Sequence, residues 1–178
     1  MMSNTAKKVE KLSRFKPCNF TRKSIYEFAE YVAGQTKDKN INIESLIDTD
    51  FGGKIEYQQY DDWLQTEEGS IIVRGHRDFT IFISNFTSST RDRFTIAHEL
   101  GHYVLHSQMG KIQGRAQRFT ALGTKDLVEY EADWFAAGFL MPTKKIKHFK
   151  SIYEIAWACN VSLEASRRRL STLQEFGF

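Results

Sequence analysis

The sequence predicts an α+β fold in which helices pack on a small, mostly antiparallel sheet. Between residues 54 and 84 the chain has three short runs rich in Ile, Val, Tyr, Phe and Thr, and the segments on both sides have the apolar spacing of helices. The 178 residues, of which 41% are hydrophobic and 26% charged, suit one domain with one core. A formal net charge of +3 is too small to indicate a polyanion as partner.

Residues 1–16 are expected to form a flexible basic tail. They contain no apolar run of the kind found in secretion signals, and nowhere do about 18 apolar residues follow one another. The two cysteines, Cys18 and Cys159, form neither a CxxC pair nor a disulfide ladder. These features predict a soluble protein in a reducing cytoplasm. The positive charges of the tail are Lys7, Lys8, Lys11, Arg14 and Lys16.

The first half of the chain predicts one helix followed by three strands. The helix covers residues 21–34, with Thr21 as its N-cap and Gly34 at its end. Its apolar positions are Ile25, Phe28, Ala29 and Val32. The strands are 54–60, 70–75 and 79–84, and the short "GHRD" turn between the last two predicts a hairpin.

The second half predicts helices. Ser89 and Asp92 resemble a capping box before a helix that carries "HELGH", and a helix over 126–141 ends at Pro142. The apolar face of this second helix is Val128, Ala132, Phe135, Ala136, Phe139 and Leu140. From residue 151 we expect a short helix, a turn near Asn160 and a longer helix from Ser162. Residues 17–150 are therefore expected to form the main domain, and 151–178 a C-terminal helical pair packed on it.

The stretch "HELGH" has the arrangement of a catalytic metal site. On a helix, His98 and His102 are one turn apart, so their imidazoles face the same way and can meet one ion. In this HExxH pattern two neutral imidazoles hold Zn²⁺, and the carboxylate of Glu99 takes a proton from water that the metal activates. One zinc ion per chain is expected.

The alternative is that these histidines are ordinary residues of a buried or solvated helix. The apolar surroundings, "FTIA" before and "YVL" after, make an unpaired polar cluster costly and so favour a bound partner. Gly101 lowers helix propensity by about 1 kcal/mol, which is understandable if another backbone or a substrate approaches closely at that position.

The third metal ligand is expected from "VEYEAD", which offers Glu129, Glu131 and Asp133. Projected on the helix, Glu129 lies about 60° and Glu131 about 100° from the centre of the apolar face, which favours Glu129. Glu131 remains the alternative ligand, although an ordinary solvated charge is the simpler interpretation of it. Asp133, one turn after Glu129, is a candidate to accept the second N–H of a ligating imidazole.

The other histidines carry less information. His106 follows His102 by four residues, but the longer HExxHxxGxxH pattern would need a glycine and a histidine where Leu105 and Gln108 stand. We therefore interpret His106 as a helix-end residue that bonds late carbonyl groups. For His76 and His148 ordinary surface roles are expected.

The two helices together resemble a known family. "FTIAHELGHYVLH" followed by "EYEADWFAAGFLMP" is similar to the ImmA/IrrE metallopeptidases, in which an HELGH helix is joined to an E-x-x-A-x-x-F-A-x-x-L-x-x-P helix. The resemblance is firm from about Phe79 to Pro142, with Phe139 where the family has Leu. It implies a zincin-like core of the gluzincin type.

By the same resemblance His98, His102 and Glu129 would ligate the metal, with Glu99 as the base. Family members are typically encoded with a DNA-binding repressor, so the implied function is a zinc endopeptidase that cleaves a repressor or antitoxin and thereby regulates transcription. The alternative is a non-enzymatic regulator that uses a zinc-stabilised core to bind a repressor or DNA.

Three further expectations concern the reaction and its partners. The donor to the oxyanion is left open among Tyr103, Tyr130, His148 and Tyr153. A substrate peptide could add as a strand along 79–84, unless that strand is internal. Residues 154–170 also resemble a helix-turn-helix with Arg167, Arg168 and Arg169 on its second helix, although a helical cap on the peptidase domain is the favoured interpretation.

Overall fold

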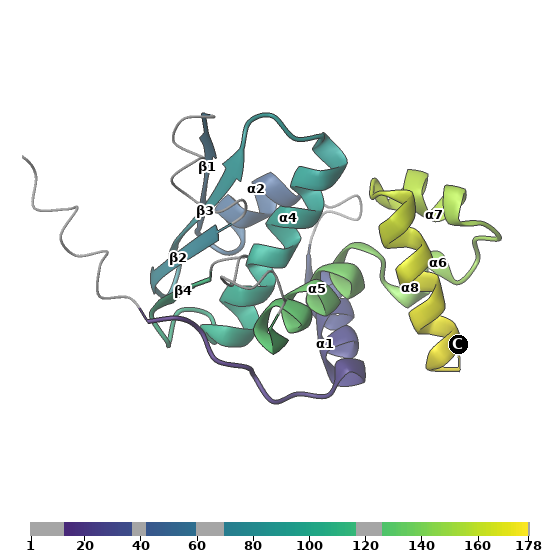
Figure 1. Ribbon diagram of the computed structural model, residues 1–178, viewed down its shortest axis with the longest axis horizontal. Helices are drawn as coiled ribbons and strands as arrows, with labels where there is room; N and C mark the ends of the chain where they lie inside the picture. The colour runs from purple at the N-terminus through teal and green to yellow at the C-terminus, as the bar shows by residue number, and fades with distance from the viewer. Residues whose placement is uncertain (1–12, 37–41, 60–69, 117–125, 178) are drawn as a thin grey trace, which may run out of the picture.

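The computed structural model describes residues 13–36, 42–59, 70–116 and 126–177, and in these ranges the chain forms a mixed sheet covered by helices (Figure 1). The N-terminal half contains α1 (Arg22–Gln35), α2 (Ile43–Thr49), β1 (Lys54–Gln58), β2 (Ser70–Gly75) and β3 (Asp78–Ser84). The C-terminal half contains α4 (Ser89–Gly101), the π-helical segment η2 (His102–His106), β4 (Gly114–Ala116), α5 (Leu127–Leu140), α6 (Thr143–Ile146), α7 (Ile152–Cys159) and α8 (Leu163–Glu175).

The sheet has the strand order β1-β3-β2-β4. β2 pairs antiparallel with both β3 and β4, so the predicted strands, their hairpin and the mostly antiparallel sheet are confirmed. β1 pairs parallel with β3, and the short β4 was not predicted, because three residues after a glycine-rich connection carry no alternation to detect. Since β3 is paired on both sides, the expectation that a peptide adds along residues 79–84 is wrong.

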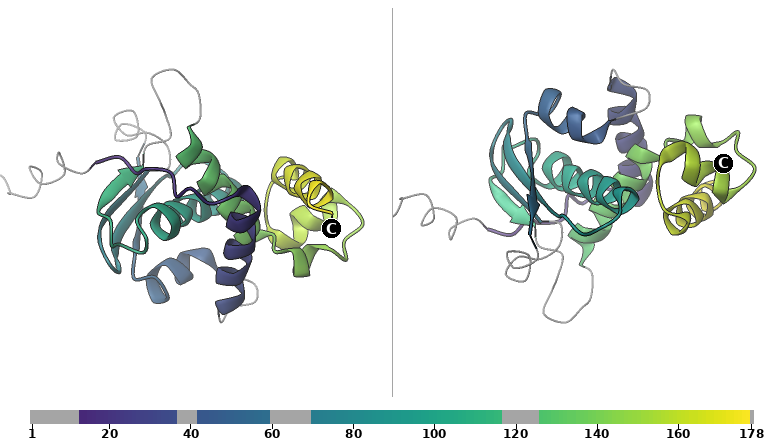
Figure 2. Two further views of the ribbon diagram at one scale, coloured as in Figure 1. Left: turned by 90° about the horizontal axis from the view of Figure 1, so that it is seen from below. Right: turned by 90° about the horizontal axis from the view of Figure 1, so that it is seen from above.

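Helix α5 lies at the centre of the helical layer. It packs against α4, which lies on the sheet, and against α1 on another side (Figures 1 and 2). All six residues of its predicted apolar face are buried. On α1 the buried face differs slightly from the predicted one. Tyr26 and Ala33 are buried, whereas Phe28 is exposed.

Most helix ends follow from capping side chains. The predicted N-cap Thr21 accepts a backbone N–H of the first turn, as do Ser151 and Ser162, where the last two helices were expected to begin. Asn160 ends α7 near the predicted turn, in the left-handed conformation with φ 50°. The cap of α4 is Ser88, one residue before the predicted Ser89. Asp92 instead accepts a hydrogen bond from the Thr87 hydroxyl, so the local signal was right but its register was wrong.

The C-terminal helices dock on α1 through a buried guanidinium. Arg169 on α8 donates to Glu30 on α1 (2.5 Å) and to the carbonyl of Met141 (3.0 Å), and it lies over the Tyr26 ring at 4.5 Å. Arg22 on α1 bonds Glu175 on α8 at 2.8 Å. In the described ranges no helix is long and apolar enough to cross a membrane.

The segment before α1 runs along the free side of β4 and under α4 and α5 (Figure 2). The N–H of Arg115 donates to the carbonyl of Ser13 (3.1 Å), and the N–H of Phe15 donates to the carbonyl of Arg115 (3.4 Å). The Phe15 side chain is buried. Of the predicted tail, residues 1–12 lie outside the described residues.

Candidate metal centre

The site is built where α4 crosses α5, and Gly101 lets the two helices approach. A Cβ atom at Gly101 would lie 3.2 Å from the Cα of Ala132 and 3.2 Å from the Cβ of Phe135. The backbone of α5 is therefore the close neighbour that the glycine in "HELGH" accommodates. This approach brings the first turn of α5, with its carboxylates, beside the histidines of α4.

His98, His102 and Glu129 converge at this crossing. The Nε2 atoms of His98 and His102 are 3.1 Å apart, and they lie 3.2 Å and 3.3 Å from the carboxylate oxygens of Glu129. Four ligands placed about 2.0–2.1 Å from Zn²⁺ at tetrahedral angles would lie about 3.3–3.4 Å from one another. The donor set and its spacing therefore fit zinc with one coordination position left over.

The electrostatics of Glu129 also suit a cation. Burial by itself raises the pKa of this carboxyl, but hydrogen bonds with His102 and His98 outweigh burial and hold the pKa well below its usual range. The group is therefore an anion at neutral pH although only 4% of the residue is exposed. An anion with two inward-facing imidazoles in a buried position is the arrangement that a bound metal ion stabilises.

Two other predicted residues, Glu99 and Asp133, come from the same two helices, and Asp133 contacts the group. Glu99 follows His98 on α4 and is fully buried. Asp133 lies one turn after Glu129, and its Oδ1 is 2.8 Å from Nδ1 of His98, the nitrogen on the far side of that ring from the cluster. This is the contact expected of a carboxylate that orients a ligating imidazole.

His106 and Glu131 lie in a second buried group, contrary to two expectations. His106 does not bond late carbonyls through its ring: its Nδ1 is 3.0 Å from Nδ1 of His102, and its Nε2 is 2.8 Å from Oε2 of Glu131. Glu131 is fully buried rather than solvated, and its Oε2 also accepts the N–H of Cys18 at 2.9 Å. The alternative third ligand thus groups with Cys18 and His106, not with His98 and His102.

The apolar composition of α5 is the sequence signal that indicates this second group. A helix with so many apolar residues is surrounded on several sides, so a second carboxylate on it had to be buried and paired.

Burial, assisted by the charge of His102, lowers the pKa of His106 to about 4, although Glu131 opposes this effect. Burial likewise raises the pKa of the Cys18 thiol to about 11, and Glu131 adds to it.

The tyrosines proposed as oxyanion donors are placed differently from one another. Tyr103 is buried and stacked on Phe79, and its hydroxyl accepts the N–H of Arg77 at 3.0 Å. Tyr130 is partly exposed on α5, next to Glu129, and its ring stacks on Trp134. Tyr153 is exposed on α7, as is His148 just before that helix. Tyr103 and Tyr130 each follow a candidate ligand in the sequence, His102 and Glu129, and of these two only Tyr130 is exposed.

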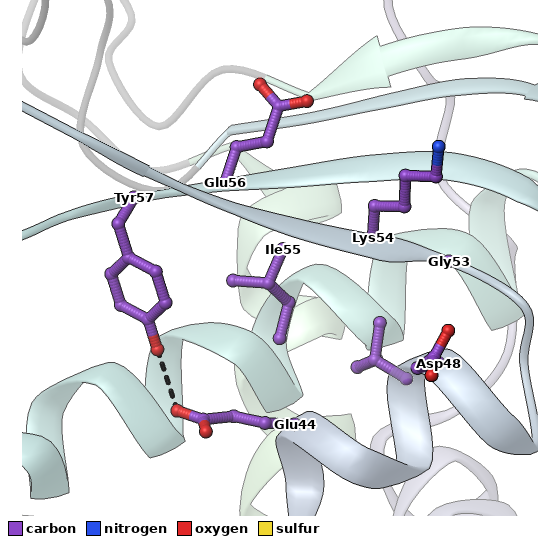
Figure 3. Close-up of a pocket in the computed structure, with 8 residues that line it drawn as sticks. Glu44, Asp48, Gly53, Lys54, Ile55, Glu56 and Tyr57 are labelled. Carbon is purple, nitrogen blue, oxygen red and sulfur yellow. Dashed lines mark hydrogen bonds between the residues drawn. The ribbon is translucent and has the colours of Figure 1, made fainter.

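A hollow of about 350 Å³ lies elsewhere, between β1 and α2 (Figure 3). Its lining includes Glu44, Asp48 and Lys54, and the Tyr57 hydroxyl donates to Glu44 at 2.7 Å. None of the candidate metal ligands lines it. We therefore assign it no part in the chemistry at the α4–α5 crossing.

Comparisons with known proteins identify a family for this chain. No curated protein matches the sequence. A Mycobacterium tuberculosis transcriptional regulator has a similar fold, with a TM-score of 0.53 and 19% identity over 88% of this chain. The chain spans about half of that regulator, 49% of its length. The family of M78 peptidases, described as the IrrE N-terminal-like domain, matches residues 66–171, which include both helices of the site. The chain therefore belongs to the M78 peptidase family, the group of IrrE N-terminal-like domains.

Proposed function

We propose that the protein is a zinc-dependent endopeptidase that hydrolyses a peptide bond in a partner protein. The observation that carries the proposal is the buried cluster of His98, His102 and Glu129, in which the two Nε2 atoms are 3.1 Å apart and each lies 3.2–3.3 Å from a carboxylate oxygen of Glu129. Its dimensions suit Zn²⁺, and the family is one of peptidases. We expect one zinc ion per chain.

In this proposal His98, His102 and Glu129 hold the ion, and Asp133 orients His98. When bound, Zn²⁺ supplies a Lewis acid for the scissile carbonyl and lowers the pKa of water. Glu99 accepts the proton of the attacking water and passes it to the leaving amine, since a buried carboxylate beside the ligands is suited to carry a proton between the two groups. Tyr130 is our candidate donor to the oxyanion.

A pair of variants tests these roles. Glu99→Gln should bind zinc like the wild type and lose peptide cleavage, because an amide cannot accept the proton of water. Glu129→Gln should lose zinc, because the neutral amide is a poor ligand for the ion. Metal content by mass spectrometry and cleavage of a quenched peptide library are the measurements. Cleavage by Glu99→Gln at the wild-type rate would rule out this carboxylate as the base.

For the substrate we propose a DNA-binding repressor or antitoxin encoded nearby, so that cleavage changes transcription and takes place in the cytoplasm. The family resemblance implies such a partner, and the fold neighbour is named as a transcriptional regulator. The test is to incubate the purified protein with the repressor encoded beside its gene and to search for cut products. Glu99→Gln is the matched control, since it should bind the same repressor without cutting it.

A second candidate function is supported by the burial of the site. Each of His98, Glu99, His102 and Glu129 is at most 4% exposed, as in a metal site that stabilises a core. In that case the protein is a zinc-stabilised regulator that binds a repressor or DNA without cleaving anything. Retained partner binding with no cleavage in the presence of zinc would favour it.

We also propose that residues 17–150 form the peptidase domain and that 151–178 form a helical pair docked on it. The buried Arg169 supports docking. The other two arginines considered for DNA contacts, Arg167 and Arg168, both pair with Glu164 at 2.8 Å on the surface of α8. Direct DNA binding through this pair is therefore a minor alternative, and an electrophoretic shift assay with and without Arg167→Ala and Arg168→Ala tests it.

A further inference from the structure

The second buried group shares a hydrogen bond with the metal centre. His106, on η2, is 4% exposed, and its Nδ1 meets Nδ1 of His102, whose Nε2 points at the other candidate ligands. On its other side His106 meets Glu131, which is anchored by the backbone N–H of Cys18. A continuous chain thus runs from Glu131 through His106 to His102.

The hydrogen bonds between these three residues are buried against Phe15. The Phe15 ring stacks on both imidazoles, with centroids 6.1 Å from His102 and 6.2 Å from His106. Since His102 and Glu131 are both fully buried, water cannot readily replace His106 between them. The imidazole of His106 is therefore the group that satisfies the outer nitrogen of His102.

The positions of the protons decide which group is the donor in each hydrogen bond between His102, His106 and Glu131. A neutral His102 that binds a metal through Nε2 must carry its proton on Nδ1, and Nδ1 of His106 lies 3.0 Å away to accept it. Neutral His106 must then carry its own proton on Nε2, where it points at the carboxylate oxygen of Glu131. Each hydrogen bond has one donor and one acceptor in this arrangement, and the reverse direction would put a proton on the ligating nitrogen of His102.

We propose that His106 and Glu131 are positioning residues that hold His102 in its metal-binding tautomer. The inference rests on the zinc site of the proposed function and extends it to two residues that touch neither the metal nor the substrate. A carboxylate that orients a ligating histidine is a common device, as Asp133 is placed to do for His98. Here a second imidazole is inserted between the carboxylate and the ligand.

The same proton positions exclude a second metal ion beside His106. Cys18, His106 and Glu131 are close enough to hold a metal, but that would require the lone pair of His106 at Nε2. With the first site filled, this nitrogen carries the proton donated to Glu131. The two groups therefore cannot both be occupied while His102 and His106 are neutral, and the stoichiometry should remain one zinc per chain even at excess metal.

The direct test is the tautomer of each histidine in the zinc-bound wild-type protein. Long-range proton–nitrogen correlation spectra of protein with ¹⁵N-labelled histidine distinguish the two neutral forms, and the assignments follow from single variants. We expect the proton on Nδ1 for His98 and His102 and on Nε2 for His106. A His106 protonated on Nδ1, or a second zinc ion per chain, would overturn the proposal.

Zinc affinity provides a second readout. In competition with a chelator, His106→Phe should weaken binding by about 10- to 100-fold, the range typical of residues that orient metal ligands. His106→Gln should recover part of this lost affinity, because its amide oxygen can accept the N–H of His102. If His106→Phe fails to fold, the affinity of His106→Gln tests the positioning role by itself. The exposed His76→Gln is the control and should bind like the wild type, since His76 bonds the Met109 carbonyl away from the chain of contacts.

The outcomes separate this inference from the proposed function. If the wild type binds no zinc, the proposed function fails. If the wild type binds one zinc and folded His106→Phe and His106→Gln bind it equally tightly, the positioning role is refuted while the zinc site stands.

Discussion

Gly101→Ala tests whether the close crossing of α4 and α5 sets the geometry of the metal centre. The added methyl would lie 3.2 Å from the Cα of Ala132 and from the Cβ and Cδ1 of Phe135. Ordinary carbon–carbon contacts are about 3.5–4.0 Å, so the helices must separate by about 0.3–0.8 Å at this point. One of the contacts is backbone, so a change of side-chain rotamer cannot relieve all of the crowding.

The separation acts differently on stability and on metal binding. Alanine improves helix propensity by about 1 kcal/mol, and overpacking costs about 1–3 kcal/mol, so the net loss of unfolding free energy is about 0–2 kcal/mol. Glu129 lies one turn before Ala132 on α5, and metal–ligand distances tolerate deviations of only about 0.2 Å. We therefore expect zinc affinity to fall by about 10- to 100-fold, which is a larger effect than the change in stability suggests.

Gly138→Ala is the matched control for this prediction. Gly138 is on the same helix, and a Cβ there would lie 3.1 Å from the Cβ of Ala29 and from Tyr26, at the contact between α5 and α1. It should reduce the urea midpoint while leaving zinc affinity, measured by chelator competition, close to that of the wild type. Equal zinc affinities for Gly101→Ala and Gly138→Ala would refute the argument that the crossing distance positions the ligands.

Three further predictions follow from charges and thiols. Because its pKa is raised to about 11, the thiol of Cys18 should be alkylated by iodoacetamide at pH 8 about 100-fold more slowly than a free cysteine; an ordinary rate would contradict the assigned burial. Arg169→Met should lower the unfolding free energy in urea by about 2–3 kcal/mol, since it leaves the partly buried Glu30 without its cationic partner, whereas the exposed Arg168→Met should change it little. The pKa of His106 is lowered to about 4 in the folded protein from 6.5, so the unfolded chain binds more protons between these values. In urea titrations, the unfolding free energy of the metal-free protein should therefore fall by up to about 3 kcal/mol as the pH falls from 6.5 to 4. The unfolding free energy of His106→Gln should fall by less over the same pH range.

The candidate site shows how local spacing carries information about chemistry. The i, i+4 spacing of His98 and His102 fixes which way two rings face on any helix, and Glu129 could be favoured over Glu131 from its angle to the apolar face. Gly101 indicated a close approach before the approaching backbone was known. These inferences depend only on residues within one or two helical turns, whose relative directions are set by the covalent geometry of the helix.

The sequence alone therefore determined β1, β2 and β3, several helix ends, the apolar face of α5 and the candidate ligands, because these depend on periodicity and nearest neighbours. It did not determine the parallel pairing of β1 with β3, the internal position of β3, or the burial of His106 and Glu131. Those features result from packing between segments as far apart as Cys18 and Glu131, 113 residues apart in the chain. Only the tertiary structure decides which side of a largely apolar helix faces a neighbour, and so whether a carboxylate on it is solvated or pairs with a histidine.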